Sequence, residues 1–292
     1  MNDAIPSPTP ALQGMQRGRR ALLTFGLMWL VPGCVGGLPW HRNEYGPPPP
    51  ARASKTDLIQ HLNANISKIY AWRSTSVTIK ARTGLPMQLS GVIAVESPRN
   101  FRLRVSSVMG DEADFGSNPE RFWFWMRRNE PKHVYTSTHD DMHKAMQKLP
   151  LPFQPDWLMD VLGVIPLDPS QFEVETTDAR TLTVSLVSEQ LSPAGQPIKR
   201  LIVVDAQHGV ILGHYLYDVR GTLIARAVMK NYRFHPQAQV NFPHSIDLDW
   251  PQAGMAMTLS IGRDVEINPS SLPQPTFELP QIPGSPMMDL GR

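Results

Sequence analysis

Two histidines four residues apart are the first groups in this sequence that could bind a metal. They stand at the two ends of His139-Asp140-Asp141-Met142-His143. In a helix such a pair shares one face and could chelate zinc, with Asp140 placed where zinc hydrolases carry a general base. No convincing third ligand is present, and paired aspartates are also typical of a helix start. We therefore expect no metal site, and a metal-dependent hydrolase is the least favoured hypothesis.

Two carboxylates form a second candidate constellation. Asp247 and Asp249 would lie on one face of a predicted strand, about 7 Å apart, and a carboxylate pair is the usual equipment of a hydrolase. The simpler interpretation is that they are outward-facing residues beside an apolar stripe. The sequence contains no Gly-x-Ser-x-Gly elbow, P-loop or dinucleotide-binding fingerprint. We expect no catalytic residues and no cofactor.

Apolar side chains predict chemistry of another kind, the binding of a lipid. Residues 122–125, Phe-Trp-Phe-Trp, would put aromatic rings on both faces of one strand. An acyl chain gains about 25 cal/mol per Å² of apolar surface buried, so a lipid cavity needs no catalytic groups. The alternative is an ordinary core, where aromatic residues also dominate. The predicted cavity residues are Trp72, Phe101, Leu103, Phe115, Phe122, Phe124, Phe153, Trp157, Leu158 and Leu162.

The only cysteine, Cys34, follows an N-terminus of the export type. Three arginines precede the apolar run 21–31, which has the length of a signal-peptide core and is too short to span a bilayer. Residues 30–34, Leu-Val-Pro-Gly-Cys, resemble the lipobox of bacterial lipoproteins. The resemblance implies a lipid on the Cys34 sulfur, cleavage before it, and anchoring by acyl chains such as palmitate. We expect 1–33 to be the signal peptide; the alternatives are a short buried helix and a free buried cysteine.

Composition limits the remaining functions. Of the 292 residues, 41% are hydrophobic and 18% charged, which is enough apolar material for a folded core. The formal charge of +2 resides in residues 1–33, so the remainder is neutral. A neutral body without basic runs argues against nucleic acid as a partner. A single cysteine excludes an intramolecular disulfide and a cysteine-based zinc site.

The chain divides into a tether, a body and a tail. Residues 34–53 contain four consecutive prolines at 47–50 and predict an extended spacer. Residues 54–268 form the predicted body, and the proline-rich segment 269–292 is expected to be irregular. The body should open with a helix, because Ser54 and Asp57 fit a capping box and residues 58, 62, 66 and 69 are apolar.

Most of the body alternates polar and apolar residues with period two. Examples are 101–105, 182–186, 246–250 and 255–261, as in antiparallel strands with one buried face. Two further helices are predicted at 140–149 and 156–162. The expected fold is α+β but mainly β: one strongly curved antiparallel sheet of about eleven strands. It would form an open or incomplete β-barrel with helices against its concave face.

This layout resembles the LolA/LolB superfamily of outer-membrane lipoprotein carriers and receptors, together with LppX-like lipoproteins. The likeness rests on the lipobox at Cys34, a helix ending near Tyr70, the strand–proline turn–strand pattern of 91–103, and the Gly-Ser-Asn and Phe-Trp motifs within 114–125. It implies a half-barrel whose helices plug an apolar cavity. The receptors of this group also carry an apolar residue on a protruding loop, and 108–110, Val-Met-Gly, is the candidate here.

The leading hypothesis is therefore a non-enzymatic lipoprotein of the cell envelope. It would be exported and anchored through Cys34 to the outer membrane, or to an outer leaflet facing the periplasm. Its cavity would hold a lipid or a lipoprotein acyl chain, in lipid or lipoprotein transport or sorting, and it would act as a monomer. The alternative hypothesis is a non-catalytic structural or protein-interaction module of the envelope.

Overall fold

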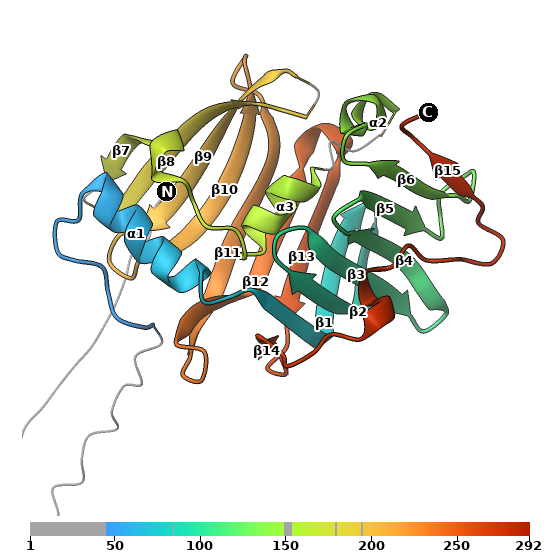
Figure 1. Ribbon diagram of the computed structural model, residues 1–292, viewed down its shortest axis with the longest axis horizontal. Helices are drawn as coiled ribbons and strands as arrows, with labels where there is room; N and C mark the ends of the chain where they lie inside the picture. The colour runs from blue at the N-terminus through green and yellow to red at the C-terminus, as the bar shows by residue number, and fades with distance from the viewer. Residues whose placement is uncertain (1–44, 84, 149–153, 179, 194) are drawn as a thin grey trace, which may run out of the picture. The chain divides into compact units, whose positions relative to one another are not determined.

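A computed structural model describes residues 45–83, 85–148, 154–178, 180–193 and 195–292 (Figure 1). The predicted signal peptide, the lipid-attachment residue Cys34 and the predicted cavity residue Phe153 lie outside these ranges. None of the described helices combines the length and apolar character needed to cross a bilayer.

The described chain contains three α-helices and short 3-10 turns among many strands. The helical elements are α1 (Lys55–Ile66), α2 (Met142–Lys148), α3 (Pro155–Val161), η1 (Pro169–Gln171), η2 (Pro251–Ala253) and η3 (Gln274–Phe277). The strands are β1 (Ala71–Thr83), β2 (Leu85–Glu96), β3 (Asn100–Ser107), β4 (Gly110–Ser117), β5 (Arg121–Met126), β6 (Val134–Thr138), β7 (Glu173–Asp178), β8 (Thr183–Leu191), β9 (Pro197–Asp205), β10 (Val210–Asp218), β11 (Leu223–His235), β12 (Val240–Trp250), β13 (Met255–Ile261), β14 (Glu266–Ile267) and β15 (Met287–Asp289).

All of these strands belong to one open sheet built from two meanders. The N-terminal arm runs from β1 outward to β6, and the C-terminal arm runs from β13 outward to β7. Pairing of β1 with β13 joins the arms at the centre, in a register that places Val77 opposite Ile261. Burial alternates along β3 and β9, as expected for strands with one face against a core.

The predicted open, mainly β fold is confirmed, with two corrections. The sheet has 15 described strands, more than the eleven or so expected. It is also mixed, because β15 pairs in parallel with β6. The segment 269–292, predicted to be irregular, contributes this strand and η3.

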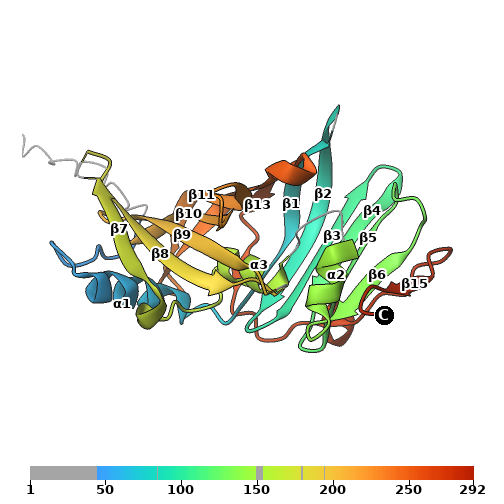
Figure 2. The same cartoon turned by 90° about the horizontal axis from the view of Figure 1, so that it is seen from above.

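The connection from β6, which lies next to the edge strand β15, crosses to β7 at the opposite edge of the sheet and carries α2, α3 and η1. Figure 2 shows the sheet bent into an arch, with α1 and α3 beneath it. Two helices are therefore found where 140–149 and 156–162 predicted them, with slightly different ends. Gly163, with φ of +75°, follows α3 in the left-handed conformation that ends helices at low cost.

The first helix begins as the sequence predicts and is then fixed by two asparagines. Ser54 and Asp57 form the complete capping box. The Asn63 amide exchanges two hydrogen bonds of 2.7 Å with the backbone of Leu167. The Asn65 amide does the same with Asn241, at 2.6 and 3.1 Å. These paired bonds seat α1 between the crossover connection and β12.

The end of the predicted tether packs on the body. The Tyr45 ring stacks on His208 with centroids 4.1 Å apart, and the Gly46 amide donates to Asn241 Oδ1 at 2.7 Å. A Cβ on residue 46 would lie 2.8 Å from the Phe234 ring, so this close approach requires glycine. The packed body therefore begins before residue 54, inside the segment 34–53 that was predicted to be a spacer.

Candidate functional site

An apolar groove of about 300 Å³ lies on the concave face of the N-terminal arm. Its lining comes from β1 to β5 and from β13, which pairs with β1. Its side chains are aliphatic, aromatic or methionine except at one end. Gly91 of β2 makes space for the Ile79 side chain of the lining, because a Cβ on residue 91 would lie 2.7 Å from Ile79 Cδ1. The groove is lined by Ile79, Ala81, Leu89, Leu103, Val105, Glu112, Ala113, Phe115, Met126, Arg128, Asn129, Met255, Ala256 and Met257.

A smaller apolar pocket of about 40 Å³ adjoins the groove and is bordered by Leu158 of α3. The two hollows share Leu103, Phe115, Met255 and Met257. The smaller one adds residues of α3 and of the central strands, and its exposed lining is entirely apolar. The added residues are Ile93, Phe101, Leu158, Leu162, Leu248, Trp250 and Leu259.

The structure brings five of the predicted cavity residues together in these hollows. They are Phe101, Leu103, Phe115, Leu158 and Leu162. That these residues bind a lipid stays a prediction.

Four other predicted cavity residues line neither hollow. Trp72 is fully buried and donates from Nε1 to the carbonyl of Leu162 at 3.1 Å, which holds the end of α3 against the sheet. Trp157 packs edge-on against Trp250, with centroids 6.2 Å apart. Phe122 and Phe124 lie in a separate cluster with Met142 and Ala145 of α2. These four side chains are core, as the alternative interpretation of the aromatic residues has it.

The methionines are the main feature that sequence reasoning left out of the cavity. Met255 and Met257 alternate with small residues, a pattern that predicted a strand but not a lining. Met126 joins them from β5. Methionine has flexible bonds and a polarisable sulfur, so it adapts to ligands of varied shape. Three methionines in the lining, from strands on either side of the groove, suit a ligand that occupies many conformations.

A buried ion pair anchors α3 to the C-terminal arm. Arg200 of β9 contacts Asp160 of α3 at 3.0 Å, and their side chains are 8% and 17% exposed. The guanidinium also lies 5.4 Å from the Phe172 ring centroid and 3.5 Å from His214 Nδ1. Sequence reasoning missed this cluster, since no spacing links a helix residue to a strand 40 positions later.

Burial changes the proton affinity of this cluster. It raises the pKa of the Asp160 carboxyl to about 6, against the opposing attraction of Arg200. Burial also holds the pKa of His214 well below its usual range, and the Arg200 charge adds to that shift. Near neutral pH the cluster is therefore an aspartate–arginine pair beside an uncharged imidazole.

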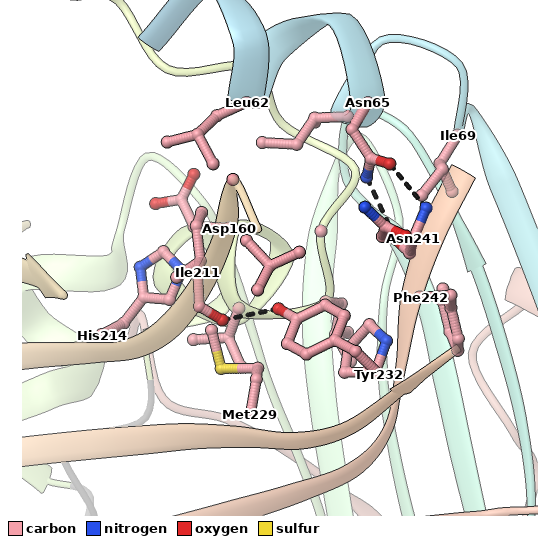
Figure 3. A pocket seen from close by; sticks show the side chains of 17 residues that line it. Leu62, Asn65, Ile69, Asp160, Ile211, His214, Met229, Tyr232, Asn241 and Phe242 are labelled. Carbon is pink, nitrogen blue, oxygen red and sulfur yellow. Dashed lines mark hydrogen bonds between the residues drawn. The ribbon is translucent and has the colours of Figure 1, made fainter. Parts of the chain in front are cut away.

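The concave face of the C-terminal arm is almost filled. Figure 3 shows Leu62 and Asn65 of α1 closing over Ile211, Met229 and Phe242 from the strands. About 50 Å³ remains, bordered also by Asp160, His214 and the Tyr232 ring, whose hydroxyl donates to the Ile211 carbonyl at 2.5 Å. This is space for a few waters, not for an acyl chain.

The proposed two-histidine metal face does not form. The helix α2 begins at Met142, so His139 precedes it, and His139 Nε2 instead lies 2.8 Å from the Asn118 carbonyl. Across the described residues, no three His, Cys, Asp or Glu side chains gather as a metal site would require.

The two carboxylates of β12 are used in ion pairs on the sheet surface. Asp249 contacts Arg226 at 2.8 Å, and Asp247 contacts Lys230 at 2.7 Å. The Thr258 hydroxyl also donates to Asp247 at 2.7 Å. Both partners come from neighbouring strands, which fits the outward-facing interpretation and leaves no hydrolase pair.

The β3–β4 hairpin carries an exposed apolar tip. Val108 is fully exposed and Met109 is 78% exposed. The Arg127 side chain supports this tip by donating to the carbonyls of Asp111 at 2.6 Å and Met109 at 3.0 Å. The loop 108–110, identified from the sequence as a candidate, is therefore a turn that is fixed by hydrogen bonds from Arg127. It exposes two apolar side chains, Val108 and Met109.

Together these features define an open half-barrel with crossover helices on its concave face and an apolar groove between them. The chain is similar to the "putative outer membrane lipoprotein-sorting protein domain" of Vibrio parahaemolyticus, with a TM-score of 0.52 and 11% identity over 77% of this chain and 97% of that one. At this identity the match shows a shared fold, and the resemblance predicted from the sequence is confirmed at that level.

Two further solved structures match with a TM-score of 0.48. A DUF1329 family protein from Desulfovibrio piger is 10% identical, over 77% of this chain and 95% of that one. A LolA superfamily protein from Nitrosomonas europaea is 12% identical, over 78% of this chain and 98% of that one. No protein-family model and no curated protein matches the sequence.

Proposed function

We propose that this protein is a non-enzymatic, lipid-anchored lipoprotein of the cell envelope that holds an acyl chain in the groove of its N-terminal arm. The observation that carries the proposal is the groove itself, which measures about 300 Å³, is almost wholly apolar and shares four lining residues with the pocket under α3. That volume is at the lower end of ligand sites in proteins. The acyl chain would belong to a lipid or to a lipoprotein in transport or sorting.

The anchor in this proposal is Cys34. The body begins to be held at Tyr45 and Gly46, eleven residues after the cysteine. Fully extended, that length reaches about 35–40 Å. Acyl chains on Cys34 would keep the body close to the membrane surface, either the outer membrane or an outer leaflet facing the periplasm.

The apolar tip of the β3–β4 hairpin would make a second membrane contact. Val108 and Met109 are exposed, and residues of this kind partition into the headgroup region. The tip belongs to the same arm as the groove. A chain leaving the groove would therefore do so on an arm that also touches the bilayer.

A groove-filling substitution tests the lipid-binding proposal. Met257→Trp enlarges a half-buried side chain of the groove wall, and Met287→Trp makes the same change at an exposed position on β15. The full chain is purified in non-ionic detergent, and co-purified lipids are quantified by mass spectrometry. Wild type and Met287→Trp should retain lipid, while Met257→Trp should lose at least ~tenfold, about 1.4 kcal/mol. Lipid-free wild type, or equal retention by Met257→Trp, would refute the proposal and leave the interaction module as the better hypothesis.

Metabolic labelling tests the anchor separately. Cells producing the full chain are grown with an alkyne analogue of palmitate. Wild type should carry the label and fractionate with membranes, and Cys34→Ala should lose both properties. A wild-type chain without label would refute the anchor without affecting the groove.

A further inference from the structure

The groove has one polar end, which indicates what kind of acyl compound it takes. Among its described lining residues, only Glu112, Arg128 and Asn129 are polar. Glu112 lies on β4, and Arg128 and Asn129 lie in the turn after β5. Apolar sites that bind amphiphiles use a few polar groups to fix the ligand's orientation. An acyl chain along Leu103 and Phe115 would therefore place its head group at this end.

The polar groups at this end differ in how fully they are already used. Glu112 accepts a hydrogen bond of 2.6 Å from the Ser107 hydroxyl. The guanidinium of Arg127, the neighbour of Arg128, donates hydrogen bonds to the carbonyls of Asp111 and Met109. The side chains of Arg128 and Asn129 make no hydrogen bond or ion pair with any described residue. At this end of the groove the N–H donors of Arg128 and Asn129 are therefore unpaired within the described part of the chain, and the one carboxylate beside them, Glu112, already accepts a hydrogen bond from Ser107.

The chemistry of these donors selects an anion. A guanidinium has five N–H groups in a planar fork that matches a carboxylate or a phosphate, and it stays charged at every physiological pH. The Asn129 amide adds two more donors. The arginine stem can also lie along the apolar wall while its head meets solvent or ligand.

Resting on the proposed function, we propose that the ligand is a single-chain amphiphile with an anionic group at the head of its acyl chain. The chain lies along Leu103, Phe115 and Met257 toward α3, and the anionic group is held by Arg128 and Asn129. A fatty acid carboxylate and a lysophospholipid phosphate share this chemistry. A neutral amphiphile of equal chain length fits the groove but gains nothing at its end.

The test compares ligands that differ only in the head. The full chain, in one fixed concentration of non-ionic detergent at pH 8, is titrated with palmitate, 1-hexadecanol and palmitoyl lysophosphatidic acid. Arg128→Gln removes the charge in an exposed turn. Arg263→Gln is the matched control, because Arg263 is also exposed and lines none of the described hollows.

Palmitate should bind wild type and Arg263→Gln at least ~fivefold more tightly than hexadecanol does. Arg128→Gln should abolish that preference while hexadecanol binding is unchanged, which also shows that the groove is intact. Tighter binding of the lysophospholipid than of palmitate would identify phosphate as the preferred anion, and the reverse would identify carboxylate. Equal binding of palmitate and hexadecanol to wild type, or an unchanged preference in Arg128→Gln, would overturn the inference and leave the proposed function standing. Binding of none of the three would overturn both.

Discussion

The concave faces of the two arms of the sheet differ in how completely side chains and helices fill them. In the C-terminal arm, α1 packs into the curve and leaves about 50 Å³. In the N-terminal arm, a groove of about 300 Å³ remains among the described residues. Both arms are meanders with an apolar inner face, so the strands alone do not decide which face stays open. The difference shows that the placement of helices turns one half into core and leaves the other as a binding surface.

The largest effect should come from the ion pair that ties α3 to the C-terminal arm. Asp160→Ala leaves the Arg200 charge buried without its partner, which typically costs about 3–5 kcal/mol. Asp156→Ala on the same helix removes an exposed pair with Arg99 and should cost at most ~1 kcal/mol. Urea unfolding of the two variants measures the contrast. Equal losses would mean that the buried pair does not hold α3 in place.

Truncating one methionine in each arm should show, by the loss of stability, which of the two belongs to a packed core and which lines an open groove. Met229 is 4% exposed and borders the small cavity, so Met229→Ala should cost about 2–5 kcal/mol. Met257 is half-buried and faces the groove, where empty space already exists. Met257→Ala should therefore cost at most ~1 kcal/mol by the same measurement. If Met257→Ala is as costly as Met229→Ala, the groove is packed in solution.

The pH dependence of stability should differ between wild type and Asp160→Asn. The pKa of Asp160 is raised to about 6 in the folded state from 3.8, so the folded protein holds this proton more tightly than the unfolded chain. Wild type should therefore gain stability relative to the variant as pH falls from about 6 to 3.8, by at most ~1.4 kcal/mol per pH unit.

His214 acts in the opposite direction in both proteins, because its pKa is lowered. Its contribution to stability is lost as pH falls below 6.5, and it cancels when the two proteins are compared. Denaturant midpoints from pH 4 to 7 give the difference. A constant difference would show that Asp160 does not titrate in this range.

The smallest effect concerns the hairpin tips of the two arms. Replacing Val108 and Met109 together with serine removes apolar surface that would enter a membrane and should weaken vesicle binding ~fivefold, about 1 kcal/mol. Val219, at the β10–β11 turn of the other arm, is also exposed, and Val219→Ser should have no effect. Co-sedimentation with vesicles, using Cys34→Ala as the common background, measures both. Similar losses at the two tips would remove the membrane role from the β3–β4 hairpin.

Local patterns predicted most of the strands and the first helix, because each is encoded within a few residues. The strand β4 escaped prediction since its sequence, Gly-Asp-Glu-Ala-Asp-Phe-Gly-Ser, is poor in strand-forming residues. It is held from outside, by β3 and β5 and by the Arg102–Asp114 pair at 2.7 Å. The short β14 and β15 likewise exist only through pairing with β1 and β6.

The site was predicted less well than the fold. Phe101 and Leu103 were predicted to line a cavity because they share the apolar face of a predicted strand, and Phe115 because it is one of several aromatic residues that could form a pocket. Phe122 and Phe124 share the same pattern but are covered by α2, and no sequence spacing tells which inner face a distant helix covers. For the same physical reason, the partners Asp160 and Arg200 and the open end at Arg128 emerged only in three dimensions.

The central pairing of β1 with β13 also governs the order of assembly. Each meander can form from neighbouring hairpins. The pairing of β1 with β13 joins residues far apart in the sequence, such as Val77 and Ile261, so it cannot form until the end of the body has been made. Such distant contacts slow folding. Until they form, β1 presents a row of unpaired amides and carbonyls that any other strand could join. A newly made chain is therefore most exposed to aggregation just before its last long strand arrives, and a chaperone would be needed most at that moment.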